Sequence, residues 1–117
     1  MAEFNPQPVY TAPTIAVDQD NYNPDPDDAI FAILMLLSSS ANVSITGFAG
    51  NTYLGDLLPT RLVFWTNIGG NNITLKKEDA GSDEQNRFSL PANVVLGPGD
   101  TILLVYDSTS QRWRKSS

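Results

Sequence analysis

The sequence predicts an all-β protein: an antiparallel β-sandwich or jelly-roll-like domain of about seven or eight strands, preceded by an extended N-terminal arm. Two observations predict the sandwich. From Ile68 to Trp113, turn residues cut short apolar runs at close intervals. Within several runs, apolar and polar residues alternate with the period of a half-buried strand. A third observation predicts the arm: residues 1–28 hold five of the eight prolines, and each proline fixes φ and removes a backbone donor.

The arm is taken as residues 1–28 and the sandwich domain as residues 29–117. The arm carries six acids and no base, whereas the other residues carry seven of each and sum to zero. A loose terminal tail is one interpretation. However, a disordered linker is poorer in large apolar side chains than this segment. We therefore expect the arm to lie on a neighbouring subunit through six anchors: Phe4, Val9, Tyr10, Ile15, Val17 and Tyr22.

The longest apolar run, Ile30–Leu37, has eight residues and two interpretations. Asp27 or Asp28 would N-cap a short helix. A strand buried on both faces is the alternative, and it is favoured by the serines at 38–40 and the β-rich sequence after them. Either way, the run exceeds what one face of a small sandwich buries, and an exposed apolar patch marks an interface. The predicted subunit interface is Ile30, Phe31, Ile33, Leu34, Met35, Leu36 and Leu37.

The strands of the body follow from local patterns. Residues 43–48 alternate apolar and polar side chains, and residues 61–68 form the strongest β-run, rich in aromatic and β-branched residues. Gly69–Asn72 predicts a hairpin turn, with residues 73–76 as its return strand. After a polar loop at 78–86, further strands are expected at 87–90, 94–96, 101–106 and 111–115.

Composition excludes several kinds of chemistry. Without cysteine or histidine, the chain lacks Ser-His-Asp and Cys-His arrangements and the usual zinc ligands. Eight apolar residues are too few to span a membrane, and no basic footprint for nucleic acid is present. The N-terminus does not have the pattern of a signal peptide. We expect no enzyme activity, no cofactor, no metal, no nucleic-acid partner and no membrane partner.

Smaller clusters have a functional and an ordinary interpretation. The carboxylates of Asp25, Asp27 and Asp28, or of Glu78, Asp79, Asp83 and Glu84, suit calcium, but capping and solvation explain them. The aromatic side chains of Trp65, Trp113, Tyr53 and Phe64 suit stacking on sugar rings, but most aromatic residues in strands pack in the core. The core is favoured for Trp65, in the strongest strand, whereas Tyr53 in a glycine-rich loop is expected to be exposed. Asn42 and Asn72 match the glycosylation pattern by chance. Arg112, Arg114 and Lys115 form a small basic end that would pair with the acidic arm of a neighbouring copy.

Six stretches of the chain form one recognisable pattern: Val43–Gly47, Leu62–Leu75, Glu78–Ser82, Asn86–Phe88, Leu96–Asp100 and Leu104–Arg114. Together, over roughly residues 42–115, they resemble a small β-module of tailed-bacteriophage virion proteins. Such modules occur in tail fibres, in baseplates and on heads as decoration (cement) proteins, and they are typically homotrimeric β-sandwiches. The resemblance implies a structural role in the virion and supplies no catalytic residues.

The short body and the long arm favour the head over the tail. The expectation is a homotrimeric capsid decoration protein on the outer surface of the head, whose arms clamp neighbouring subunits of the major capsid protein. An extended arm suits this role because it covers a large surface. The alternative is a tail-fibre or baseplate module that recognises glycans on the host surface.

Overall fold

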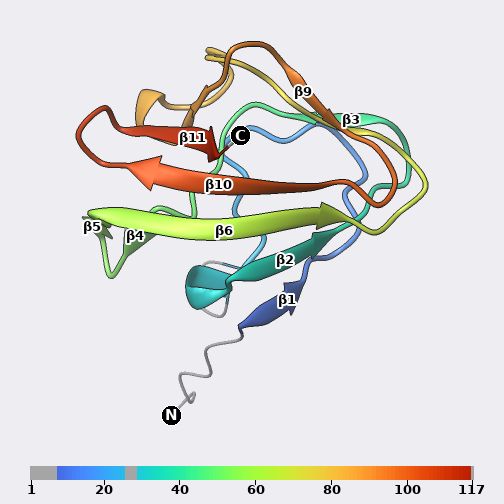
Figure 1. Ribbon diagram of the computed structural model, residues 1–117, viewed down its shortest axis with the longest axis horizontal. Helices are drawn as coiled ribbons and strands as arrows, with labels where there is room; N and C mark the ends of the chain where they lie inside the picture. The colour runs from blue at the N-terminus through green and yellow to red at the C-terminus, as the bar shows by residue number, and fades with distance from the viewer. Residues whose placement is uncertain (1–7, 26–28, 117) are drawn as a thin grey trace.

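Two β-sheets enclose the core in the computed structural model, which describes residues 8–25 and 29–116 (Figure 1). The large sheet has six strands, in the order β1 (Val9–Thr11), β2 (Leu34–Leu37), β6 (Thr60–Asn67), β10 (Thr101–Asp107), β11 (Arg112–Ser116) and β8 (Phe88–Ser89). The small sheet has three: β3 (Val43–Ile45), β7 (Ile73–Leu75) and β9 (Val94–Leu96). A hairpin of β4 (Thr52–Tyr53) and β5 (Asp56–Leu57) and two 3-10 turns, η1 (Ala29–Phe31) and η2 (Glu84–Asn86), complete the fold.

The all-β sandwich-like class is confirmed, but the pairing is not purely antiparallel as predicted. Strand β2 pairs with β6 in parallel, and β3 pairs with β7 in parallel. The reason is the path of the chain, because β2 leads into β3 and β6 leads into β7, each time from the large sheet to the small one. Two equivalent crossings side by side place both pairs in the same direction.

The hairpin predicted at Gly69–Asn72 is therefore wrong, since β6 and β7 lie in different sheets. The segment turns a corner between the sheets, and the fully buried side chain of Asn67 closes it. Its Nδ2 donates to the carbonyl oxygens of Asn71, at 2.7 Å, and Leu96, at 2.8 Å. Its Oδ1 accepts from the backbone N–H of Gly69, at 3.0 Å. Asparagine supplies both donor and acceptor at a place where no ladder continues.

Aromatic rings from distant parts of the chain fill the core. Trp65 and Trp113 are fully buried, and Phe48 lies 4.9 Å from each of them, measured between ring centroids. The indole Nε1 of Trp113 donates to the carbonyl oxygen of Phe48 at 2.7 Å. The core position favoured for Trp65 is confirmed and is shared by Trp113, and a buried Trp N–H that finds an acceptor is the expected arrangement.

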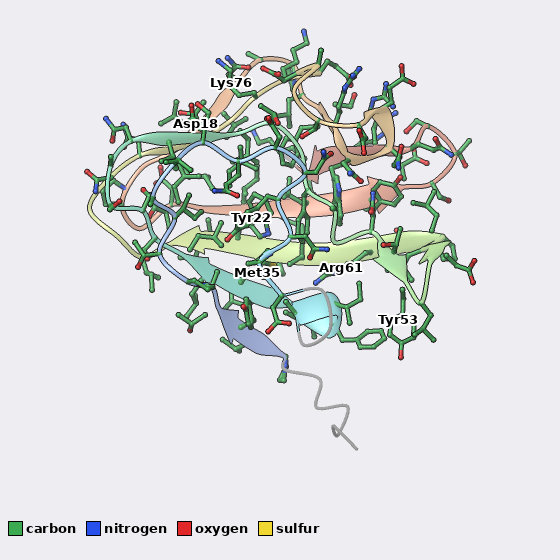
Figure 2. All side chains as sticks on the ribbon, turned by 180° about the vertical axis from the view of Figure 1, so that it is seen from behind. Asp18, Tyr22, Met35, Tyr53, Arg61 and Lys76 are labelled. Carbon is green, nitrogen blue, oxygen red and sulfur yellow. The ribbon has the colours of Figure 1, made fainter. Side chains whose placement is uncertain are left out.

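The predicted arm requires a correction, because its described part lies on its own chain. Residues 8–25, which we call the strap, run parallel to residues 34–48 across both sheets. The strap first adds β1 to the edge of β2 and then makes single bridges to Ser39, Ile45 and Phe48. Figure 2 shows it crossing the inner side of the large sheet, with Tyr22 lying against the middle of that sheet.

Backbone hydrogen bonds explain why the strap stays on its own body. The prolines keep the strap extended. The backbone N–H groups of Ala12, Ile15 and Tyr22 donate to the carbonyl oxygens of residues 36, 38 and 47 at 2.8–3.0 Å. The side chains of the same three residues are buried. The boundary expected at residue 28 thus does not separate an arm from a domain, since residues 8–25 contribute to the core.

A polar clamp holds the far end of the strap to the loop that contains η2. Asn21, at φ +48°, donates its N–H to Ser82 Oγ at 2.8 Å. Its Oδ1 accepts from the N–H of Asp83, at 2.8 Å, and from Nδ2 of Asn86, at 2.9 Å. Asparagine tolerates the left-handed region better than most residues. The 78–86 loop, predicted as a solvated surface loop, therefore also fixes the strap.

The alternatives for the apolar run 30–37 are resolved by dividing it. Ala29–Phe31 form the 3-10 turn η1, and Leu34–Leu37 form strand β2. The strand interpretation holds for the second half of the run. In that half, alternate side chains point to the core and to the opposite face, which leads to the candidate site.

Candidate assembly surface

The large sheet has an apolar face on the side away from the core. Strand β2 sends Met35 and Leu37 into the core, so its other side chains face outward. The register places Leu34, Phe64 and Leu103 in one cross-strand row, and Leu62 opposite Val105 in the next. Seven side chains make up this surface, which we call the outer face: Val9, Leu34, Leu36, Leu62, Phe64, Leu103 and Val105.

Side chains on the outer face are substantially accessible. Leu62 is 55% exposed, Val9 50% and Phe64 39%, and the other four are half-buried. The small sheet offers a contrast: the corresponding outward row is Ser44, Thr74 and Val95. The outward side of the small sheet is thus largely polar. The outward side of the large sheet exposes contiguous apolar side chains, of the kind that marks an interface.

Polar groups border the outer face and satisfy one another. At one end, the hydroxyls of Thr66 and Thr101 lie 2.7 Å apart. At the other end, Nε of Arg114 lies 3.1 Å from Oδ2 of Asp107. A hydrogen bond from Ser110, and then one from Arg114, lowers the pKa of the Asp107 carboxyl below its ordinary value. The carboxylate at this border therefore stays ionised and paired.

Two arginines of the basic end form ion pairs within their own chain, and pairing of this end with the acidic arm of a neighbouring copy stays a prediction. Arg112 pairs with Glu78 at 2.9 Å, and Arg114 pairs with Asp107, both within the chain. Lys115 is exposed on β11. Glu78 lies 34 residues from Arg112 in the sequence, so the local pattern did not show that pair, whereas Asp107 and Arg114 are seven residues apart, on the paired strands β10 and β11.

The structure divides the predicted subunit interface. Ile30, Met35 and Leu37 are buried in the chain's own core, so their assignment to a subunit contact is wrong. Leu34 and Leu36 belong to the outer face. Ile33 and Phe31, which precede β2 in the sequence, are 58% and 44% exposed. Within β2, strand alternation is the physical reason, because adjacent side chains point to opposite sides of a sheet, whereas Ile30 and Phe31 lie in the 3-10 turn η1.

The predicted capsid-contacting anchors divide in the same way. Ile15 and Tyr22 are buried against their own chain, so they are not available for a capsid contact. Val9 and Val17 are exposed, with Val9 on the outer face, and Tyr10 is half-buried. Phe4 lies outside the described residues.

Sequence reasoning missed four members of the outer face as interface residues: Leu62, Phe64, Leu103 and Val105. The ordinary interpretation of Phe64 as a core residue does not hold, because the residue is 39% exposed. A signal was present, because Leu62–Trp65 and Ile102–Tyr106 are continuous apolar runs without alternation. Such runs indicate strands with two apolar faces, but only the sheet order shows that the second faces lie side by side.

A second exposed apolar group lies at the end of the molecule, where the β4–β5 hairpin meets η1. Tyr53, predicted to be exposed, is half-buried at this end of the molecule (Figure 2). Its ring centroid lies 5.1 Å from that of Phe31, with an angle of 57° between the ring planes. Leu54 at the hairpin tip is 83% exposed at φ +53°. We call Phe31, Tyr53 and Leu54 the hairpin corner.

The predicted acidic clusters are described only in part. Over residues 8–25 and 29–116, no group of three or more acidic, histidine or cysteine side chains is placed to hold a metal ion. Asp27 and Asp28 fall outside that range. Asn42 is engaged within the chain, because its Oδ1 accepts from the N–H of Asn72 at 2.9 Å.

Comparison with known proteins found no matching family model, no matching curated protein and no matching solved structure. Among the residues that the structure describes, no helix is long and apolar enough to cross a membrane.

Proposed function

We propose that this chain is a structural protein of a tailed-phage virion, acting as a homotrimeric decoration protein on the outer surface of the head. The single observation that carries the proposal is the outer face of the large sheet. A protein that functions by assembly needs a surface whose burial by a partner lowers the free energy, by about 25 cal/mol per Å² of apolar area. The proposal of a virion is supported by the resemblance of residues 42–115 to the β-module of tailed-bacteriophage virion proteins.

In this role the protein would stabilise the shell by mass action. Many copies that bind only the assembled, expanded shell lower its free energy relative to the unassembled subunits. The major capsid protein is the proposed partner, and the chain is proposed to act without catalysis or a cofactor. The outer surface of the head is the proposed location.

The decisive measurement is the position of the protein on virions. Gold-labelled protein added to particles that lack it should decorate the head in regular positions, and those heads should resist heat longer than undecorated heads. Label found on the tail, or on neither part, would overturn the proposal.

The structure changes how the arm must be tested. Deleting residues 1–28 would remove β1 and the buried residues Ala12, Ile15 and Tyr22, so loss of binding would only report unfolding. Deleting residues 1–7, with Phe4, leaves these elements in place. If this end of the arm contacts the capsid, the shortened protein should keep its melting temperature and bind shells less tightly.

The hairpin corner favours a second candidate function, a tail or baseplate module that binds host glycans. An exposed aromatic side chain can pack on the C–H face of a sugar ring, and Tyr53 and Phe31 lie together at one end of the molecule. This candidate predicts saturable binding of the isolated protein to host-surface glycan that Tyr53→Ala abolishes. An unchanged binding curve for Tyr53→Ala would dismiss it.

A further inference from the structure

We infer that the outer face of the large sheet is covered by a second copy of this chain, so that Val9, Leu34, Leu36, Leu62, Phe64, Leu103 and Val105 form the centre of a self-association interface. The inference rests on the proposed function, in that it names the partner of the proposed assembly surface. It differs from the sequence expectation, which placed the contact over the whole run 30–37.

Charge is the first argument for a second copy. The chain has a net charge of −6, so two copies repel each other over most approaches. The described residues that point outward from β1, β2, β6 and β10 include one acid, Asp107, and Arg114 neutralises it at 3.1 Å. On this side, two copies can approach each other without bringing like charges together, as a contact between copies requires.

The layout of the face is the second argument. Interfaces place apolar side chains at the centre and polar groups at the rim. Here the Leu34–Phe64–Leu103 row and the Leu62–Val105 pair are central. The hydroxyl pair of Thr66 and Thr101 borders one end, and the Asp107–Arg114 pair borders the other. The rim groups are already satisfied within the chain, so covering the centre does not strand a charge.

The area is the third argument. Strands β6 and β10 have eight and seven residues, and β1 and β2 have three and four. At about 3.3 Å per residue and about 4.8 Å between strands, they present on the order of 350 Å² in projection. The face therefore supplies the centre of an interface, and not the whole of a standard one of ~800 Å² per partner.

Other occupants fit these observations less well. Nucleic acid and anionic lipid both require unpaired basic groups, whereas Arg112 and Arg114 beside the face are held by Glu78 and Asp107. A second copy requires only the apolar surface that is present. The experiments below distinguish a second copy from the capsid subunit as the partner of this face.

The test uses two matched positions. Leu62 on the outer face is 55% exposed, and Val95 on the opposite sheet is 53% exposed. Because the chain has no cysteine, Leu62→Cys and Val95→Cys each introduce a unique thiol. We expect a short thiol–thiol cross-linker to join the Leu62→Cys chains at micromolar concentration, with at least tenfold less product for Val95→Cys.

Charge substitution gives an independent measurement on the full chain. By light scattering, the wild type and Val95→Lys should show a multiple of the 12.7 kDa chain mass, and Leu62→Lys should show the mass of one chain. Both variants should keep the circular dichroism spectrum and the strand content of the wild type. A monomeric wild type, or a Leu62→Lys protein that stays assembled, would overturn the inference.

These outcomes are separate from those of the proposed function. If Leu62→Lys dissociates the oligomer but the wild type never decorates virions, the interface stands and the proposed role in the virion is wrong. If the wild type is monomeric and Leu62→Lys loses binding to shells, the face contacts the capsid subunit. The second copy inferred here and the homotrimer of the proposed function are then wrong, whereas the location on the head stands.

Discussion

The guanidinium of Arg61 lies 5.4 Å from the centre of the Phe48 ring, and the residue is only 8% exposed. Its NH1 donates to the carbonyl oxygen of Gly50 at 2.6 Å, and its NH2 donates to those of Ala29 and Ala32 at 2.7 and 3.1 Å. Burial lowers the pKa of Arg61 to about 10, so the side chain is still charged at neutral pH. One cation thus joins η1, the loop before β4 and strand β6 (Figure 2).

This arrangement predicts a large loss of stability for Arg61→Met. The substitution keeps the apolar volume but leaves buried carbonyl oxygens without a donor, which costs about 2–4 kcal/mol. Denaturant unfolding should show this as a lower midpoint. Arg112→Met is the control, since its surface pair with Glu78 is worth no more than about 1 kcal/mol. Equal losses for the two variants would contradict the prediction.

Two buried tyrosines predict opposite responses to removal of the hydroxyl. The Tyr22 hydroxyl is buried and has no hydrogen-bond partner within the described part of the chain, so Tyr22→Phe should be neutral or stabilising by up to about 1 kcal/mol. The Tyr106 hydroxyl donates to the carbonyl oxygen of Gln85 at 3.0 Å. Tyr106→Phe should therefore destabilise by about 1 kcal/mol. Urea unfolding of the two variants checks the sign of each difference.

The same tyrosines predict cooperative unfolding at alkaline pH. Burial raises the pKa of both Tyr22 and Tyr106 above the ordinary value of 10.0. A group whose pKa is higher in the folded state binds its proton more tightly there, so its contribution to stability is complete below pH 10 and declines above it. Tyrosinate absorbance from these residues should appear together with loss of the circular dichroism signal. Ionisation of all four tyrosines before any structural change would contradict this assignment.

The hairpin tip predicts a stabilising substitution. Leu54 and Gly55 have φ values of +53° and +85°, and both central positions of a type I′ turn need positive φ. Leucine pays roughly 1–2 kcal/mol for that conformation, whereas asparagine is much better tolerated there. Leu54→Asn should therefore raise the free energy of unfolding by about 0.5–1 kcal/mol. Ile68→Asn, which also replaces a large exposed apolar residue, provides the control because its φ is not positive, and it should not stabilise.

Sequence patterns located most strands, because alternation and turn residues act over a few positions. The strands at 61–68, 73–76, 94–96 and 101–106 appear within a residue or two of their expected bounds. The burial of Trp65 and Trp113 was also predictable, since large rings within apolar runs seldom remain outside. The interface residues were harder to assign: Met35 and Leu36 are neighbours in one apolar run, yet they lie on opposite sides of β2.

The strap illustrates the other limit. Its prolines correctly predicted an extended conformation, but an extended chain can lie on its own body or on another. The choice depends on whether carbonyl oxygens and apolar space are available nearby, and residues 36–47 of the same chain supply both for Ala12, Ile15 and Tyr22. This information is non-local, so it is not contained in the composition of residues 1–28.

By itself, the sequence determined the all-β class, the acidic and proline-rich character of the first 28 residues and the apolar strands of the body. All of these depend on local properties of the chain: side-chain polarity, period and turn preference. Only the tertiary structure decided that the chain crosses between two sheets in parallel, that the strap belongs to its own core, and that β2, β6 and β10 present their second apolar faces together. Those outcomes depend on which strands become neighbours, and neighbours in a sheet are chosen by packing between residues far apart in the chain.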